Sequence, residues 1–199
     1  HELATARGLT HIATGYILRN AVKAGTELGR KVEAVLEDGG LVPDGIMMDL
    51  IEEHLAAPTA KQGWLMDGFP RTHPQAVGLQ ERLSRLGQKI DRVVVLDVPD
   101  DVIVARISRR LTCSACGEGT AHPTVVNSDP GDLVCPHCGK KALYQRPDDH
   151  EVTVRSRLEL YRAQTVPAEE VLRAHYPLHR VNGVGELRVV AERIRSALR

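Results

Sequence analysis

The chain is poor in aromatic side chains and carries no net charge. Phe, Tyr and Trp make up 3% of its 199 residues, so its core has to be built from Leu, Val, Ile and Ala. Lys plus Arg and Asp plus Glu both number 26, which leaves no overall field to attract nucleic acid or an anionic membrane. No apolar run approaches the roughly 18 residues of a membrane span, and we recognise no signal peptide. We therefore expect a cytoplasmic protein that binds neither membrane nor nucleic acid.

Cysteine is also scarce, but its four residues form a pattern. Cys113 and Cys116 make one pair and Cys135 and Cys138 another, each with two intervening residues and a following glycine. This spacing is typical of structural zinc sites, in which four thiolates leave no coordination position open for catalysis. Disulfides would need an oxidising compartment, iron or cobalt could also occupy four thiolates, and His137 inside the second pair could replace one of them.

Helical and strand patterns alternate along the chain, which predicts an α/β fold. Continuous apolar runs at residues 63–67 and 92–98 are typical of buried parallel strands, and residues 74–86 between them predict a crossover helix. Helical spacing predicts further helices over residues 14–36, 43–55, 100–110, 150–173 and 186–198, with a last short strand over 180–182. The cysteine segment interrupts this alternation from about residue 111 to residue 145.

The segment Asp67-Gly68-Phe69-Pro70-Arg71-Thr72, followed by Gln75, places a carboxylate, a flexible backbone and a guanidinium at the end of a predicted strand. Such a site suits phosphate, because the planar guanidinium binds phosphate through two parallel hydrogen bonds. Each of these residues also has a plainer interpretation. Asp67 could cap the following helix, and Arg71 and Gln75 could be ordinary surface residues.

The segment 67–75 resembles the signature of the adenylate kinases, and other segments match that family in order along nearly the whole chain. The matching pieces are Ala13-Thr14-Gly15 with Arg19, residues 40–44, Arg106 with Arg110, the cysteine segment, and residues 144–149, 153–158 and 181–183. The resemblance is to long-lid, zinc-containing bacterial adenylate kinases. It implies a monomer with the three-layer P-loop nucleoside monophosphate kinase fold, an AMP-binding subdomain over residues 13–43 and a zinc-ribbon-like lid insertion over residues 109–147.

The resemblance also implies a reaction, ATP + AMP ⇌ 2 ADP, with Mg²⁺ bound alongside ATP and structural Zn²⁺ held by the four cysteines. The AMP-binding residues that it implies are Thr14, Arg19, Gly40, Leu41, Val42, Gly68, Phe69, Pro70, Arg71, Gln75, Arg146 and Arg157. The ATP-binding residues that it implies are Arg106, Arg110, Thr120, Ala121, His122 and Gly185. The implied catalytic residues are Asp67, which would orient water around Mg²⁺, and Arg71, Arg110, Arg146 and Arg157, which would surround the transferred phosphoryl group.

The chain departs from the family pattern at several positions. Arg109 replaces a common glycine before Arg110, so either arginine could reach phosphate, and Arg155 remains an alternative to Arg157. More importantly, no Gly-x-x-x-x-Gly-Lys-[Ser/Thr] phosphate loop occurs in the sequence. Because that loop grips phosphates through its backbone N–H groups and its lysine, we expect these 199 residues to have little kinase activity by themselves. We also expect a gap between the strands at 63–67 and 92–98, where the first strand of the family's sheet would lie.

Other functions remain open from the sequence. Another nucleoside monophosphate kinase would share most of these residues, although Thr14 and Gln75 favour adenine. A degenerate relative that only binds AMP would share the residues for that nucleotide. A zinc-ribbon module for nucleic acid or protein would share the cysteines, but the neutral charge and the absence of basic clustering around them speak against it.

Overall fold

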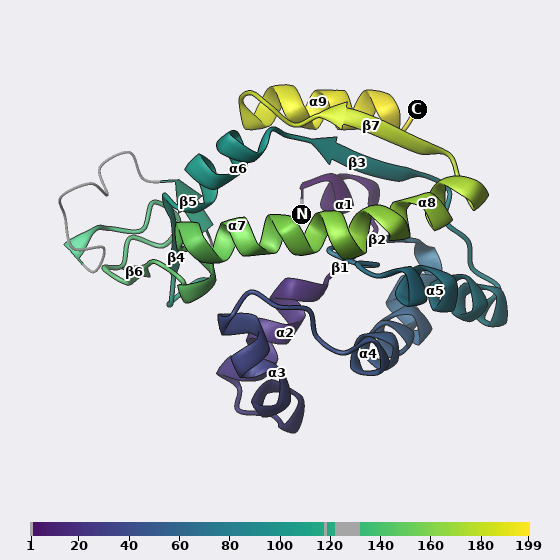
Figure 1. The fold of residues 1–199 in the computed structure, drawn as a ribbon, viewed down its shortest axis with the longest axis horizontal. Helices are drawn as coiled ribbons and strands as arrows, with labels where there is room; N and C mark the ends of the chain where they lie inside the picture. Colours follow the sequence, from purple (N-terminus) through teal and green to yellow (C-terminus); the bar gives the residue numbers. More distant parts are fainter. Residues whose placement is uncertain (1, 118, 122–131) are drawn as a thin grey trace. The chain divides into compact units, whose positions relative to one another are not determined.

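The computed structural model describes residues 2–117, 119–121 and 132–199 (Figure 1). The chain forms two compact units. The first takes in the described parts of residues 1–36, 41–97 and 160–199, and the second takes in those of residues 37–40 and 98–159. None of the helices in the described ranges has the length and hydropathy of a membrane span.

The first unit contains two parallel, two-stranded sheets and the helices packed against them. The strands are β1 (Thr10–Ala13) with β2 (Trp64–Asp67), and β3 (Val93–Asp97) with β7 (Leu178–Asn182). The helices are α1 (Glu2–Arg7), α2 (Thr14–Lys23), α3 (Glu27–Glu37), α4 (Asp44–Ala56), the short η1 (Pro58–Gln62), α5 (His73–Leu86), α8 (Val166–His175) and α9 (Leu187–Ala197).

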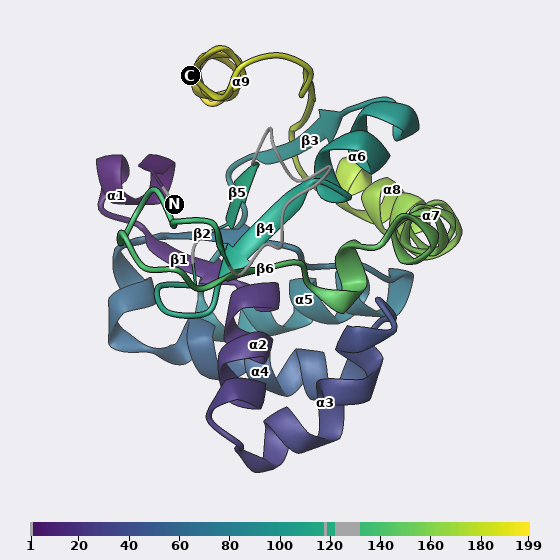
Figure 2. The ribbon, with the colours of Figure 1, turned by 90° about the vertical axis from the view of Figure 1, so that its left-hand side faces the viewer.

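The second unit is built around a small antiparallel sheet. Its middle strand, β4 (Arg110–Cys113), pairs with β5 (Gly119–Ala121) on one side and with β6 (Leu143–Tyr144) on the other (Figure 2). The helices of this unit are α6 (Asp100–Ile107), the short η3 (Pro147–Asp149) and α7 (Glu151–Leu160). The π-helical turn η4 (Tyr161–Thr165), which follows α7 in the chain, belongs to the first unit.

The two strands predicted from continuous apolar runs are present as β2 and β3. They do not pair with each other, because β2 pairs in parallel with β1 and β3 pairs in parallel with β7. Ala13 aligns with Asp67 at the carboxyl end of one sheet, and Asp97 aligns with Asn182 at that of the other. The α/β class with parallel strands is therefore confirmed. β2 and β3 lie in separate sheets, and the gap for a further strand between them stays a prediction.

The largest core cluster of the first unit lies among β1, β2 and helices α2 to α5. Ile12, Val32, Ile51 and Leu55 are fully buried in it. Leu, Ile, Val and Met supply most of this core, as the scarcity of aromatics predicts, together with Phe69. Helix α5 packs beside both α4 and α8 (Figure 1). The first turn of α5 contains the candidate site residue Gln75.

The single helical region predicted over residues 14–36 is wrong at residues 24–26. Gly25 takes a positive φ of 62° just after α2, and the Thr26 hydroxyl then accepts a hydrogen bond from the Gly29 N–H at 3.0 Å, in the first turn of α3. The two helices approach closely because Gly29 has no side chain. A Cβ at that position would lie 2.1 Å from the carbonyl oxygen of Ala21.

The helix predicted over residues 100–110 is shorter than expected. α6 ends at Ile107, and Arg110 begins β4 instead. The backbone of Arg110 therefore pairs with that of Ala121 in the antiparallel sheet. The change from helix to strand sets the direction in which the Arg110 side chain leaves the backbone.

A polar network surrounds the π-helical turn η4. Pro167, in the first turn of α8, cannot donate a backbone hydrogen bond to the preceding turn, which accounts for the widened helix. Tyr161 donates a hydrogen bond to Glu169, a carboxylate that is only 7% exposed. Arg180 donates to Glu169 and to Asp97, each at 2.7 Å. The network thus connects η4 with α8, β7 and β3.

This network predicts a stability change at alkaline pH. Burial and the hydrogen bond to Glu169 raise the pKa of Tyr161 to about 12. Since the ordinary value is about 10, the stabilisation by Tyr161 is complete below about pH 10 and is lost as the pH rises toward about 12. Tyr161 is 39% exposed, so we expect Tyr161→Phe to lower the unfolding free energy by only about 1 kcal/mol at about pH 9.

The measurement is urea unfolding of the parent and of Tyr161→Phe at several pH values between about 9 and 12. We expect the difference in unfolding free energy to shrink toward zero across this range. A difference that stays constant, or that grows with pH, would contradict the assigned hydrogen bond.

Candidate functional site

The first group of candidate residues lies at the carboxyl ends of β1 and β2. Because the strands are parallel and Ala13 aligns with Asp67, the residues that follow them are neighbours. The buried hydroxyl of Thr14 donates to the carbonyl oxygens of Asp67 and Gly68, at 3.2 and 3.1 Å. Arg71 donates from Nε to the same Gly68 oxygen at 2.7 Å. The structure thus brings four residues that the sequence predicted into one place.

Glycine is required at position 68 for two reasons. Its φ of 79° is unfavourable for residues with a side chain, and a Cβ would lie 2.9 Å from Oγ1 of Thr14 and 3.0 Å from Nη2 of Arg71. Phe69, which follows, is 8% exposed and belongs to the core cluster, while Pro70 is half-buried. The loop therefore has a buried anchor on one side and a guanidinium beside its backbone.

Gln75 is 2% exposed, and its side-chain amide is held from both ends. Its Oε1 accepts a hydrogen bond from the backbone N–H of Arg71 at 2.7 Å, and its Nε2 donates to Oδ1 of Asp44 at 2.8 Å. Thr72 caps helix α5 by accepting from the Gln75 N–H at 3.2 Å, and its own hydroxyl donates to Oδ1 of Asp44 at 3.0 Å. Gln75 is therefore a fixed element of the loop and not a loose surface residue.

The remaining predicted AMP-binding residues are distributed between the two units. Arg19 places its guanidinium over Gly15, where an added Cβ would lie 3.1 Å from Nη1 of Arg19. Val42 is buried in the core cluster of the first unit and Leu41 is half-buried. Gly40 belongs to the second unit, so its place beside the other residues stays a prediction.

The second unit gathers three predicted arginines around two carboxylates of η3. Arg110 donates from Nε to Asp149 at 2.9 Å, and Asp149 is fully buried. Arg146, itself 8% exposed, donates from Nε to Asp148 at 2.7 Å. Arg157 donates to the backbone oxygen and to the carboxylate of Asp148, at 3.2 and 3.3 Å. Three guanidinium groups thus share two carboxylates, which leaves an excess of positive charge.

Burial governs the electrostatics of this arginine cluster. It lowers the pKa of Arg157, and the positive charges of Arg146 and Arg110 lower it further against the attraction of Asp148. Burial would also lower the pKa of Arg110, but its hydrogen bond and charge interaction with Asp149 outweigh this effect and raise the pKa. The arginines are close enough to repel one another, and an added anion would relieve that repulsion.

The structure also bears on the two alternatives that the sequence left open. Arg155 makes an exposed ion pair with Glu151 one turn earlier on α7, at 2.7 Å, whereas Arg157 belongs to the buried cluster. Arg109 is exposed, whereas Arg110 is ion-paired with Asp149. Arg157 and Arg110 are thus the better candidates for contact with phosphate.

The predicted ATP-binding residues outside this cluster are less closely defined. Arg106 is exposed on α6, and Gly185 is exposed with a φ of 123° in the connection from β7 to α9. Thr120 and Ala121 lie in β5, where their backbones pair with residues 111 and 110. His122 lies outside the described residues.

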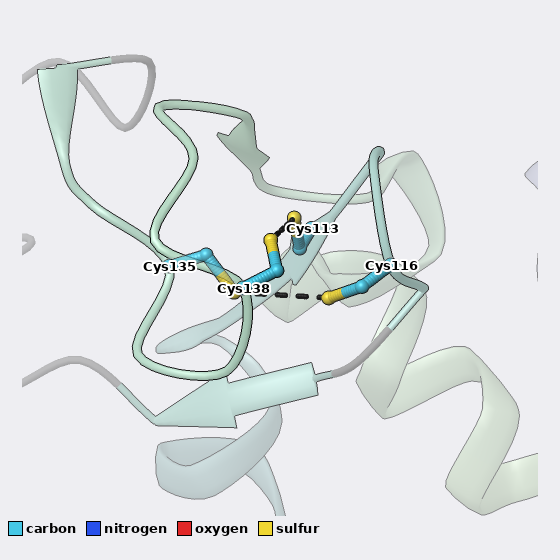
Figure 3. A group of neighbouring side chains, drawn as sticks. All are labelled: Cys113, Cys116, Cys135 and Cys138. Carbon is cyan, nitrogen blue, oxygen red and sulfur yellow. Dashed lines mark hydrogen bonds between the residues drawn. The ribbon is translucent and has the colours of Figure 1, made fainter.

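The four cysteines meet in the second unit, where their sulfur atoms all lie within 4.8 Å of one another (Figure 3). The sulfurs of Cys113 and Cys138 are 3.7 Å apart, and those of Cys116 and Cys135 are 3.8 Å apart. A tetrahedral zinc ion with Zn–S bonds of about 2.3 Å requires sulfur atoms about 3.8 Å apart. The arrangement therefore fits a four-thiolate metal centre.

The alternative of disulfides is not realised, because all four cysteines are free. Their sulfur separations also far exceed the roughly 2.05 Å of a disulfide bond. Hydrogen bonding from the backbone of Cys116 lowers the pKa of Cys113 to about 6. This shift favours the thiolate, the form that binds metal.

Comparison with known proteins identifies the family. The profile of the family described as adenylate kinase matches residues 1–176. The chain belongs to the adenylate kinase family. The adenylate kinase of Kosmotoga olearia is 39% identical to it over 193 residues, which cover 97% of this chain and 88% of the relative. That of Rhizorhabdus wittichii is 41% identical over 201 residues, which cover 99% of this chain and 91% of the relative.

Another adenylate kinase, from Caldicellulosiruptor saccharolyticus, is 45% identical over 168 residues, which cover 84% of this chain and 77% of the relative. These matches confirm the resemblance that segment 67–75 carries. They also confirm that the chain is related to phosphotransferases of the nucleoside monophosphate kinase class.

Two residues of the candidate site, Asp44 and Thr72, were not assigned a role from the sequence. A signal for Thr72 was present, since Thr72-x-x-Gln75 has the form of a helix capping box. In that pattern the glutamine usually bonds the backbone N–H of the capping residue. Here it bonds Arg71, one residue earlier. Asp44 lies in the matching segment 40–44, but no local spacing indicates its contacts, because its partners lie about thirty residues away in the chain.

Proposed function

We propose that the chain binds AMP at the carboxyl ends of β1 and β2, and that it serves the reaction ATP + AMP ⇌ 2 ADP. The observation that carries this proposal is the convergence of Thr14 and Arg71 on the Gly68 carbonyl, with Gln75 bonded to Arg71. Open α/β sheets bind ligands at the carboxyl ends of their strands. Membership of the adenylate kinase family supplies the substrate class.

Arginine side chains of the first unit would bind the AMP phosphate. Arg71 donates from Nε to the Gly68 carbonyl, and the planar guanidinium suits the geometry of phosphate oxygens. Arg19 would approach from α2, and Gln75 would read the adenine. Gly40, Leu41 and Val42 would contribute backbone groups to the same base.

The arginine cluster of the second unit would act on the phosphoryl group in flight. Phosphoryl transfer depends mainly on positioning and on positive charge around a charge-rich transition state. The three guanidinium groups of Arg110, Arg146 and Arg157 outnumber the two carboxylates that they contact. Phosphate oxygens would therefore bind these arginines without leaving a carboxylate unpaired. Exclusion of water by closure around the nucleotides would prevent wasteful hydrolysis.

Two metals belong to this proposal. The exposed carboxylate of Asp67 is a hard ligand that suits Mg²⁺ and its bound water, and Mg²⁺ would neutralise phosphate charge. The four cysteines would hold Zn²⁺, which would stabilise the antiparallel sheet of the second unit. The ATP contacts of Arg106, Thr120, Ala121, His122 and Gly185, a cytoplasmic location and a monomeric state remain predictions.

Calorimetric titration of the 199-residue chain with AMP, GMP, UMP and CMP tests the substrate class. We expect AMP to bind at least about tenfold more tightly than the others, and ADP formation to stay near background because the sequence lacks the phosphate loop. Tighter binding of a pyrimidine nucleotide would indicate another nucleoside monophosphate kinase. Salt-dependent binding of oligonucleotides without nucleotide affinity would indicate the zinc-ribbon module.

A further inference from the structure

The side-chain amide of Gln75 has two donor hydrogens and two acceptor lone pairs. One acceptor position is used by the Arg71 N–H at 2.7 Å, and one donor is used by Oδ1 of Asp44 at 2.8 Å. Within the part of the chain that the structure describes, one donor and one acceptor of the amide are thus left for a ligand. These two remaining groups lie in a fixed order.

The order is fixed because neither partner of Gln75 can change its role. A backbone N–H can only donate and a carboxylate can only accept. A half-turn of the amide would oppose Nε2 to the Arg71 N–H and Oε1 to the Asp44 carboxylate, so both contacts would become repulsive. The Thr72 hydroxyl donates to the same Oδ1 at 3.0 Å, which keeps the carboxylate in position at the start of α4.

The order of donor and acceptor is what distinguishes the two purines. Adenine presents an amino donor at position 6 beside the N1 acceptor. Guanine presents an acceptor at position 6 beside the N1–H donor. An amide that reads this edge must therefore point its oxygen toward position 6 of adenine, but its nitrogen toward position 6 of guanine. A freely turning amide could pair with either base.

We propose that Asp44 determines selectivity for adenine over guanine by holding the Gln75 amide in one orientation. This inference rests on the proposed reading of adenine by Gln75. Asp44 acts through Gln75 and is therefore a positioning residue that need not touch the nucleotide. Its removal leaves the Arg71 N–H as the remaining restraint, so the amide can turn over at the loss of about one hydrogen bond.

The test compares AMP and GMP affinities, by calorimetry on the full chain, for the parent and for variants at position 44. We expect Asp44→Ala to lower the ratio of AMP to GMP affinity about tenfold, mainly through stronger GMP binding. Asp44→Ser, which suits the first turn of a helix, should also lower the ratio, because a hydroxyl both donates and accepts. Asp44→Asn should likewise lower the ratio, because its side-chain amide also both donates and accepts.

If Asp44 had only a structural role, its replacement would weaken the binding of AMP and GMP equally and leave the ratio of affinities unchanged. That result with Asp44→Ala and Asp44→Ser would overturn the inference. Asp49→Ala serves as the matched control, because it removes an exposed carboxylate from the same helix, α4. We expect an unchanged ratio, and a changed ratio would count against the proposal.

Gln75→Ala separates this inference from the function on which it rests. If Gln75→Ala leaves AMP affinity unchanged, the proposed adenine contact is wrong, and the role of Asp44 is overturned with it. If Gln75→Ala weakens AMP binding but Asp44→Ala leaves the purine ratio unchanged, the adenine contact stands and only the inference about Asp44 is overturned.

Discussion

Replacement of Arg71 by Met is expected to lower the affinity for AMP by about 100-fold or more. Truncation of one partner of a desolvated charge pair costs about 2–5 kcal/mol, because the other charge is left without compensation. Arg71 lies at the centre of the candidate site, where its Nε bonds the Gly68 carbonyl and its backbone N–H bonds Gln75. The terminal nitrogens of its guanidinium would carry the phosphate contact. Titration of the variant with AMP measures the effect.

Two further variants show what kind of contact has been lost. Arg71→Lys retains the charge but not the planar fork, so we expect an intermediate loss of about tenfold. Arg92→Met removes an exposed arginine next to β3 that bonds the backbone of Asp91, and it should leave AMP affinity unchanged. Parent-like AMP binding by Arg71→Met would remove Arg71 from the phosphate site.

The second large effect concerns the metal. Removal of the proposed zinc ion by a strong chelator is expected to unfold the antiparallel sheet of the second unit. The buried core of that sheet consists of Leu111, Cys113, Cys135 and Leu143, so half of it is made of predicted ligands. Structural zinc contributes about 10–16 kcal/mol to the folding of small domains, far more than a core of this size could supply.

Hydrogen exchange of the backbone amides measures this effect along the chain. We expect the amides of β4 and β6 to lose protection after chelation, while those of β1 and β2 in the first unit retain it. Cys116→Ser should reproduce the loss, whereas His137→Ala should bind metal like the parent. Unchanged protection after the metal has been removed, as checked by elemental analysis, would mean that the cysteines do not stabilise this sheet.

The sequence predicts the fold best where a segment is long and its pattern is simple. The apolar run of β3 and the helix that follows the Asp67–Thr72 segment are found where expected, because each is defined by local spacing. Strand β1 was not predicted. It has four residues, of which Ile12 alone is fully buried. Its extended form depends on pairing with β2 more than fifty residues later, and no local pattern records that partner.

The candidate site shows the same division between local and distant information. Residue type and spacing identify Arg71, Gln75 and the four cysteines, because phosphate and metal chemistry permit few substitutes. The contacts that orient these residues join distant parts of the chain. Asp44 reaches Gln75 and Thr72 from α4, and Arg110 reaches Asp149 across the second unit. Such pairs are set by packing, which the sequence specifies only through the folded structure.

The most direct test of the central claim is a crystal structure of the chain with AMP bound. We expect the phosphate to accept hydrogen bonds from the guanidinium groups of Arg71 and Arg19, and the adenine to pair with the side-chain amide of Gln75. AMP bound elsewhere in the crystal, with Arg71 and Gln75 retaining only the contacts that they make without ligand, would contradict the account.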